Sequence, residues 1–231
     1  MVSALDREVK PTIAIDGPAG SGKTTVARQV AQRLGLPCVE TGAMYRAVAW
    51  QARALGIGAG DAARLAAMVE RMDLRPEAGP DCQTRIMVSG RDITDELRSP
   101  ELEQLASQVS GHAQVRRRLV EIQRRIAAGG GVVMEGRDIQ TVVLPDADVK
   151  VFLTASPEER ARRRMKDLAA AGQPAAFEEV LESIRQRDAR DEGRAASPLR
   201  AAADAVVLDT DGLSVDEVTE RVVALAKRQT P

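Results

Sequence analysis

Residues 13–25 read IAIDGPAGSGKTT, and this segment carries the strongest signal in the chain. Residues 12–15 are apolar and prone to form a strand, a glycine-rich turn follows, and a helical pattern begins at Lys23. The segment matches G-x-x-x-x-G-K-[ST] at every fixed position, in the strand–loop–helix setting that makes the match credible. Its glycines let successive N–H groups turn inward around phosphate oxygens, and the helix directs unpaired N–H groups at the same anion.

The motif predicts a nucleoside triphosphate site, whereas an ordinary glycine-rich turn is the simpler alternative. Lys23 places a full charge at the β- and γ-phosphates, and the Thr24 hydroxyl is suited to bind Mg²⁺. We therefore expect ATP as phosphoryl donor and Mg²⁺ as cofactor. The expected ATP-binding residues are Gly17, Pro18, Ala19, Gly20, Ser21, Gly22, Lys23, Thr24 and Thr25.

Composition narrows the class of protein. The chain has 231 residues and a net charge of -1, which argues against a general nucleic-acid or membrane-surface binder. No stretch approaches the about 18 apolar residues of a membrane span, and residues 1–10 lack the apolar run of a signal peptide. Cys38 and Cys82 form no disulfide or metal pattern, so we expect each to be a small, partly buried side chain. A monomeric, cytoplasmic enzyme is expected.

Short apolar runs alternate with helical patterns along most of the chain. This alternation predicts a parallel sheet covered by helices on both faces, a three-layer α/β fold. The expected helices cover residues 23–34, 40–54, 112–128, a segment from Ser156, and 214–227. The five expected strands are residues 12–15, 36–39, 132–134, 149–153 and 205–208.

The pattern changes between residues 60 and 110. Asp61 is placed to cap a helix that ends near Met72, and Ser99-Pro100-Glu101 is a well-formed helix start. Residues 84–88 alternate in polarity and predict antiparallel strands, extended by residues 91–94. We therefore expect an insert at 60–110 with its own small sheet, and a core formed by residues 10–59 and 111–228.

Ligands of parallel sheets sit outside the carboxyl ends of the strands. Glu40-Thr41-Gly42-Ala43-Met44-Tyr45-Arg46 follows the second expected strand, and Glu135-Gly136-Arg137-Asp138 follows the third. Both segments offer hydroxyl, arginine and carboxylate groups where two phosphate-bearing ligands could meet. Arg137 at a strand end favours function, whereas Arg46 taken alone is typical of a solvated helix residue.

Arginines concentrate between residues 160 and 194, although only five of the 33 basic residues of the chain are lysines. Arg160 and Arg164 share one helix face, and so do Arg187, Asp191 and Arg194. Two readings stay open. The helices are either solvated and laced by salt bridges, or they form a hinged lid over residues 156–190, joined at 172–174. A lid would exclude water and stabilise charge on the transferred phosphoryl group.

Other classes of phosphate-loop protein lack their signatures here. The chain has no N-K-x-D segment of a GTPase and no L-S-G-G-Q-like segment of a transporter ATPase. The strand at 132–134 is followed by Glu135 and not by the aspartate of a Walker B motif. A small kinase remains.

Five segments in matching order closely resemble the bacterial cytidylate kinase family: residues 17–25, 41–46 (TGAMYR), 106–109 (ASQV), 135–138 (EGRD) and 187–191 (RDARD). The resemblance covers about residues 12–228. It implies transfer of the ATP γ-phosphoryl group to CMP or dCMP, with Mg²⁺, on a P-loop kinase sheet. It also implies that the 60–110 insert is an enlarged nucleoside-monophosphate-binding region.

The resemblance implies roles for individual residues. Thr41, Tyr45, Arg46 and Arg137 would surround the acceptor phosphate. The cytosine edge would be read by Ser107, Arg116, Asp138 and Arg194, and the ribose by Arg187 and Asp191. Lys23, Arg137, Arg160 and Arg164 would be the catalytic residues, the last two within the lid. No general base is expected, because a CMP phosphate oxygen is already anionic, and His112 is expected only to start a helix.

Asp138 is the expected discriminating group. The cytosine N4 amine needs a hydrogen-bond acceptor, whereas uracil O4 would leave a buried carboxylate unpaired at a cost of about 1–3 kcal/mol. Alternatively, Arg137 holds Asp138 in an ion pair.

The chain departs from the family pattern at two positions. Gln140 stands where the family usually has glycine, which puts the backbone path beside the acceptor site in question, and Glu40 replaces Asp or Ser. Two other hypotheses stay open: a kinase of another small acceptor, such as a different nucleoside monophosphate or shikimate, and a regulatory protein that holds ATP without fast turnover.

Overall fold

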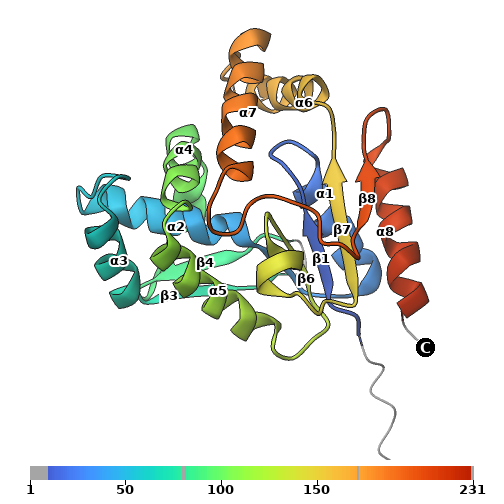
Figure 1. Cartoon of the computed structure of the whole chain (residues 1–231), viewed down its shortest axis with the longest axis horizontal. Helices are drawn as coiled ribbons and strands as arrows, with labels where there is room; N and C mark the ends of the chain where they lie inside the picture. The colour runs from blue at the N-terminus through green and yellow to red at the C-terminus, as the bar shows by residue number, and fades with distance from the viewer. Residues whose placement is uncertain (1–9, 80–81, 171, 230–231) are drawn as a thin grey trace, which may run out of the picture.

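A computed structural model describes residues 10–79, 82–170 and 172–229 of the chain. Its central sheet has five parallel strands in the order β2-β6-β1-β7-β8 (Figure 1). The strands are β1 (Ile13–Asp16), β2 (Cys38–Glu40), β6 (Val133–Gly136), β7 (Val149–Thr154) and β8 (Val206–Asp209). The predicted five-stranded parallel sheet is confirmed.

Strand β1 lies at the centre of this sheet because its side chains are apolar on both faces. All four of its residues are buried, and Ile13 is in register with Val133 of β6 and Val149 of β7. Ala14 contributes to the core on one face, while Ile13 and Ile15 contribute to the core on the other. Near-continuous apolar strands are typical of parallel sheets that are buried on both faces.

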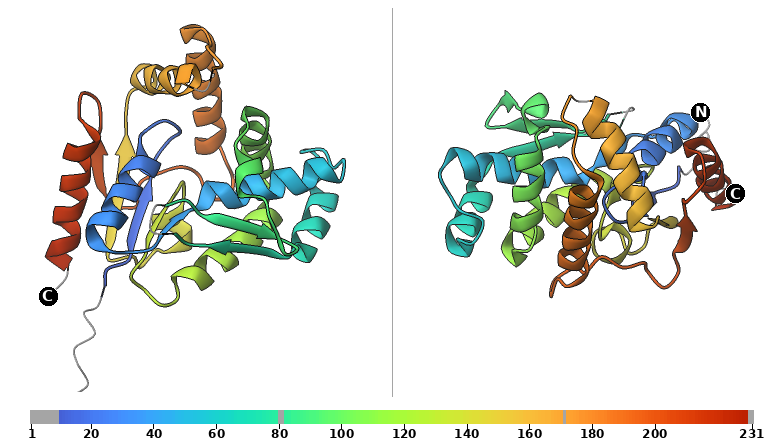
Figure 2. Two further views of the ribbon diagram at one scale, coloured as in Figure 1. Left: turned by 180° about the vertical axis from the view of Figure 1, so that it is seen from behind. Right: turned by 90° about the horizontal axis from the view of Figure 1, so that it is seen from above.

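Helices form the two outer layers (Figures 1 and 2). Helices α1 (Lys23–Leu34) and α8 (Val215–Gln229) pack together over the face that Ile13 and Ile15 line. On the other face, α2 (Thr41–Ala54) and α5 (Ala113–Ala127) share a core with Ala14 and Met134. Within the described residues, the three-layer α/β architecture is thus present.

The segment between α2 and α5 carries a second, smaller sheet. It contains α3 (Ala62–Arg71), the antiparallel sheet β3 (Leu74–Glu77), β4 (Arg85–Val88) and β5 (Arg91–Asp92), a 3₁₀ turn (Thr94–Leu97), and α4 (Pro100–Val109). Asp61 accepts a hydrogen bond from Arg64 N and Ser99 accepts one from Leu102 N, so both predicted caps are present. Strand β3 was not predicted, because Pro76 interrupts its pattern and suits only an edge strand.

Two helices lie above the carboxyl ends of the central strands (Figure 1). Helix α6 (Pro157–Ala170) follows β7, and α7 (Phe177–Glu192) returns beside it. They share a small apolar cluster of Ala161, Val180 and Ile184. No helix in the described residues is long and apolar enough to cross a membrane.

The prediction for the two cysteines is wrong. Cys38 and Cys82 are fully buried and form a disulfide bond. Cys38 N donates a hydrogen bond of 2.9 Å to Gly79 O, so the loop after β3 pairs with β2. The two cysteines are 44 residues apart, and nothing in their spacing indicates that β2 and this loop are neighbours.

Candidate active site

The phosphate loop is shaped by close backbone contacts. Gly20 has a φ of +78°, and a Cβ atom there would lie 3.1 Å from Arg160 Cβ. A Cβ atom on Gly17 would lie 2.1 Å from Leu153 O of β7, so only glycine fits. Lys23, at the start of α1, donates a hydrogen bond of 3.3 Å to Pro18 O across the loop. Pro18 and Ser21 are buried, Ala19 is half-buried, and Thr25 is exposed on α1.

Glu135 joins the phosphate loop to β6. Thr24 Oγ1 donates a hydrogen bond of 3.0 Å to Glu135 Oε1, and Lys23 Nζ lies 4.0 Å from Glu135 Oε2. Burial raises the pKa of Glu135 and lowers the pKa of Lys23 to about 7. Glu135 Oε2 is buried and has no hydrogen-bond partner in the described part of the chain. Sequence reasoning placed Glu135 in the segment after a buried strand and in the EGRD motif, but it assigned this carboxylate no role.

Asp16 ties β1 to the turn that carries Arg137 and Asp138. Its carboxylate accepts hydrogen bonds from Ile139 N at 3.0 Å and Gln140 N at 2.9 Å. The two hydrogen bonds lower the pKa of Asp16, but burial has the larger effect and raises this pKa to about 7. Sequence reasoning missed Asp16, because its partner turn is more than 120 residues away.

Gln140 is accommodated in this turn. Its backbone N–H bonds to Asp16, while its side chain donates to Val151 O at 3.2 Å and accepts from Ala202 N at 2.9 Å. The side chain is 1% exposed and therefore fills space between β7 and the segment that leads to β8. Asp16 therefore fixes the backbone beside the site even though glutamine, and not glycine, stands at position 140.

The start of α2 packs against the end of β6. Thr41 Oγ1 donates a hydrogen bond of 2.9 Å to Glu135 O, and a Cβ atom on Gly136 would lie 2.6 Å from Thr41 Oγ1. Gly136 therefore permits close approach of the two segments. Arg46, one turn further along α2, donates a hydrogen bond of 2.7 Å to Glu40.

Asp138 pairs with Arg116 of α5. Arg116 Nη2 donates a hydrogen bond of 2.5 Å to Asp138 Oδ2, and both side chains are about 5% exposed. The guanidinium also lies 5.4 Å from the centre of the Tyr45 ring, and burial raises the pKa of Tyr45 to about 12. The alternative pairing of Asp138 with Arg137 is not present.

Asp191 of α7 is shared by two of the predicted arginines. Arg137 Nε donates a hydrogen bond of 3.1 Å to Asp191 Oδ2, and Arg194 donates to Oδ1. Burial favours the neutral acid, but the surrounding arginines outweigh burial and lower the pKa of Asp191. Arg187 is close to these arginines. Burial is the main cause that lowers the pKa of Arg187 to about 10, and repulsion from Arg137 is the second.

The two predicted lid arginines have different partners. Arg160 is buried, makes two hydrogen bonds to Asp188 at 2.6 and 3.0 Å, and donates to Ala19 O of the phosphate loop at 3.2 Å. Arg164 instead donates to Glu103 of α4 at 2.9 Å. The outer faces of α6 and α7 carry exposed pairs such as Arg185 with Glu158, as expected for solvated helices joined by salt bridges, while the lid stays a prediction.

Ser107 lies on α4, near the Arg116–Asp138 pair. Ser110 O accepts a hydrogen bond from Arg116 Nη1, and Ser110 Oγ donates to Ser107 O. Ser107 Oγ accepts a hydrogen bond of 2.8 Å from Arg190. Sequence reasoning did not single out Arg190, Asp188 or Glu103, whose partners lie on other elements.

The predicted residues thus come from the carboxyl ends of β1, β2 and β6 and from helices α2, α4, α5, α6 and α7. The arginines expected at the two phosphates, and Arg194 of the expected cytosine site, are each paired with a carboxylate. These pairs are Arg46–Glu40, Arg137–Asp191, Arg160–Asp188, Arg164–Glu103 and Arg194–Asp191. A site with this surplus of oriented donors beside a phosphate loop is suited to bind two phosphorylated ligands.

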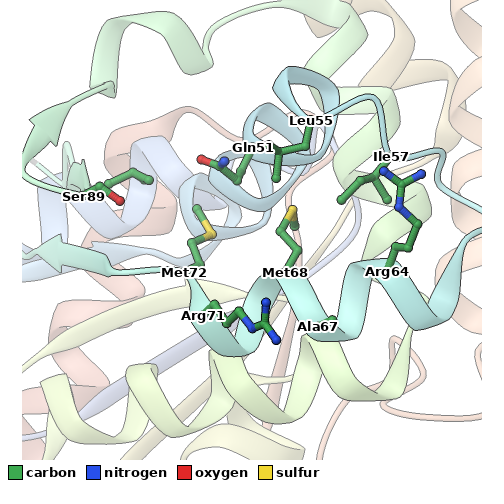
Figure 3. Close-up of a pocket in the computed structure, with 10 residues that line it drawn as sticks. Gln51, Leu55, Ile57, Arg64, Ala67, Met68, Arg71, Met72 and Ser89 are labelled. Atoms are coloured by element: carbon green, nitrogen blue, oxygen red, sulfur yellow. The ribbon is translucent and has the colours of Figure 1, made fainter.

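A separate cavity of about 360 Å³ lies between α2, α3 and the end of β4 (Figure 3). Met68 and Met72 form its floor, and Arg64 and Arg71 lie at its rim. None of the predicted site residues lines it, so it is distinct from the phosphate-loop site.

The chain is similar to known proteins over nearly its whole length. The cytidylate kinase family model matches residues 13–228. The cytidylate kinase of Desulfitobacterium hafniense is 48% identical over 92% of this chain and 91% of its own length. That of Pelotomaculum thermopropionicum is 48% identical over 93% and 95%.

A solved structure supports the fold. Shikimate kinase from Bacteroides thetaiotaomicron has a TM-score of 0.50 at 17% identity, covering 94% of this chain and 98% of its own. The family model and the two bacterial relatives span nearly the whole chain, and the range matched by the family model includes every predicted site residue. The chain belongs to the cytidylate kinase family and is a kinase.

Proposed function

We propose that the protein transfers the γ-phosphoryl group of ATP to CMP or dCMP, giving ADP and CDP or dCDP. The observation that carries this proposal is the buried Arg116–Asp138 pair, which lies at the end of β6, the strand beside the phosphate-loop strand β1. A carboxylate accepts from the cytosine N4 amine, and a guanidinium donates to its O2 and N3 atoms. The pair therefore matches cytosine in hydrogen-bond polarity.

The acceptor phosphate is proposed to lie among Thr41, Tyr45, Arg46 and Arg137. Arg137 and Arg46 already point donors at carboxylates in this region, and a phosphate offers the same bidentate acceptor. Arg187 and Asp191 are proposed to reach the ribose. Ser107 and Arg194 are proposed to complete the cytosine site with the Arg116–Asp138 pair.

Catalysis is proposed to consist of positioning and charge stabilisation. The attacking oxygen of CMP is anionic at neutral pH, so no side chain has to remove a proton. Lys23 on the phosphate loop and Arg137 on the acceptor side would share the charge of the transferred group. Arg160 reaches the loop at Ala19, and Arg164 follows one turn later on the same helix.

The residues present fit Mg²⁺. Thr24 Oγ1 and Glu135 Oε1 are both oxygen ligands of the kind that Mg²⁺ prefers, and they lie 3.0 Å apart. Glu135 Oε2 has no hydrogen-bond partner in the described residues. Mg²⁺ is usually held by one or two protein oxygens together with substrate phosphates, which agrees with this small donor set. We propose that Thr24 and Glu135 hold the ion, which would neutralise charge on the β- and γ-phosphates.

We further propose the division into a core (10–59 and 111–228), an insert that holds the acceptor (60–110) and a lid (156–190). The chain would act as a monomer, in the cytoplasm with its nucleotide substrates, and without nucleic-acid partners. The net charge of -1 favours the last point.

The test is ADP release in a coupled assay with CMP, dCMP, UMP, AMP or shikimate as acceptor. We expect CMP and dCMP to give the fastest release. Lys23→Ala should reduce the rate about 10²–10³-fold, as for loss of one group that stabilises transition-state charge. Lys227→Ala, an exposed position on α8, is the matched control. Faster release with another acceptor would reassign the substrate, and ATP binding without acceptor-stimulated release would indicate a regulatory protein.

A further inference from the structure

Helix α4 of the insert makes two contacts to the arginine-rich helices above the site. Glu103 accepts a hydrogen bond of 2.9 Å from Arg164 of α6, and Ser107 accepts one of 2.8 Å from Arg190 of α7. Glu103 and Ser107 are four residues apart and therefore share one face of α4. Figures 1 and 2 show α4 standing beside α7.

Helix α6 connects this face of the insert with the phosphate loop. Arg160 contacts Ala19 O in the loop at 3.2 Å, and Arg164, one turn later, contacts Glu103. The path from the loop to α4 thus runs through a single helix and two guanidinium contacts. A displacement of α6 would change both the Arg160 contact at the loop and the Arg164 contact at the insert.

Glu103 is also a counter-charge for other arginines. Arg187 and Arg164 repel one another across this region, while Glu103 and Asp191 stabilise the charged form of Arg187. Both partners of the Arg164–Glu103 pair are about one-third exposed, at 35% and 34%. A partly exposed pair of this kind contributes little to overall stability, so it can form and break during turnover.

We propose that Glu103 is a positioning residue that couples the acceptor insert to the donor lid, through its contact with Arg164. The proposal rests on the function proposed above, because it assigns ATP to the phosphate loop and CMP to the site beside α4. When CMP fixes the insert, Glu103 holds α6, and α6 holds Arg160 against the loop. Each nucleotide then strengthens binding of the other, because coupling between two sites is reciprocal.

The first test measures that coupling by calorimetry with a non-hydrolysable ATP analogue, with and without CMP. In the wild type, CMP should tighten analogue binding at least about fivefold, the lower end of typical coupling between sites. Glu103→Gln should reduce this factor to below about twofold. Glu101→Gln is the matched control, because Glu101 lies on the same helix but is exposed and pairs with Arg53 of α2. It should leave the factor unchanged.

The second test separates positioning from stability. Glu103→Gln should raise KM for ATP at saturating CMP several-fold and leave kcat within about twofold, since Glu103 itself touches no reacting atom and Arg164 is retained. Glu103→Asp, which keeps the charge, should restore KM in part. An unchanged coupling factor in Glu103→Gln, no coupling in the wild type, or a fall in kcat at constant KM would each overturn the proposal. A wild type that fails to phosphorylate CMP would instead overturn the proposed function.

Discussion

The environment of Asp138 indicates how one carboxylate would select a base. Its Oδ2 atom is occupied by Arg116, which holds the group in a single orientation within a nearly dry site. A ligand would then meet the other oxygen of Asp138 at a fixed position. An amine at that position completes the hydrogen bonding, whereas a carbonyl leaves two acceptors facing each other.

Asp138→Asn should therefore weaken discrimination between CMP and UMP more than it weakens catalysis in general. The amide can donate to uracil O4, so kcat/KM for CMP should fall while that for UMP falls less. The ratio of the two should drop at least about tenfold, within the 1–3 kcal/mol that an unpaired buried group costs. Steady-state kinetics with both nucleotides measures the ratio. Asp146→Asn, at an exposed position, serves as control; an unaltered ratio in Asp138→Asn would contradict the assignment.

Glu135→Gln tests the proposed magnesium site. The substitution keeps the size of the side chain and its acceptor for Thr24, but it removes the charge that would attract Mg²⁺. The Mg²⁺ concentration for half-maximal activity should rise about tenfold or more at fixed ATP. A magnesium titration measures it, with Glu121→Gln on exposed α5 surface as control. Identical titrations for Glu135→Gln and wild type would show that the ion is held without this carboxylate.

At the scale of elements, Asp16 fixes the end of β1 against the short turn at residues 139–143. Neutral Asp16 is favoured in the folded protein, because its pKa of about 7 is higher than the about 3.9 of an unfolded chain. Its contribution to stability is complete below about pH 4 and is lost as pH rises through 7.

Comparison of wild type with Asp16→Asn tests the predicted direction of this pH dependence of stability. Asparagine does not ionise, so the wild type should lose stability relative to the variant, by about 2 kcal/mol, as pH rises from 5 to 8. Urea unfolding at several pH values measures the difference. Asp148→Asn, on an exposed carboxylate that accepts from Thr12 N, controls for loss of an ordinary hydrogen-bonded acid. Parallel pH profiles for wild type and Asp16→Asn would contradict a raised pKa at Asp16.

Elements were predictable where local chemistry determines them. Capping at Asp61 predicted α3 to within a residue or two, capping at Ser99 predicted the start of α4, and the phosphate loop predicted β1 and α1. Strand β3 was not predictable, because its pairing with β4 outweighs Pro76. The turn after Asp138 was not predictable either, since its conformation depends on Asp16, far away in the chain.

The candidate site was predictable as a set of residues but not as a set of contacts. Strand ends in a parallel sheet meet at one edge, so Thr41, Arg137 and the phosphate loop could be placed together from sequence. The partners of the arginines could not be identified from sequence. Arg164 with Glu103 and Arg190 with Ser107 join helices whose relative position only the folded chain defines.

At the scale of the whole molecule, the Cys38–Cys82 bond joins the central sheet to the insert. It closes a segment of 44 residues, and such a cross-link stabilises a folded chain by roughly 2–4 kcal/mol. Reduction should lower the free energy of unfolding by about this amount, measured by urea unfolding with and without a reductant. The Cys38→Ala/Cys82→Ala double variant should be insensitive to reductant. Two titratable thiols in the denatured, unreduced protein would contradict the bond.

The pairing of every phosphate-directed arginine with a carboxylate bears on how quickly the enzyme can release its products. A guanidinium that already has an anionic partner would exchange it for another when a nucleotide binds at the proposed site, so displacement of Glu40 or Asp188 would offset much of the attraction. The same carboxylates would pair with the arginines again when a diphosphate leaves. Nucleotides would therefore bind only moderately tightly, which would favour repeated turnover over lasting retention.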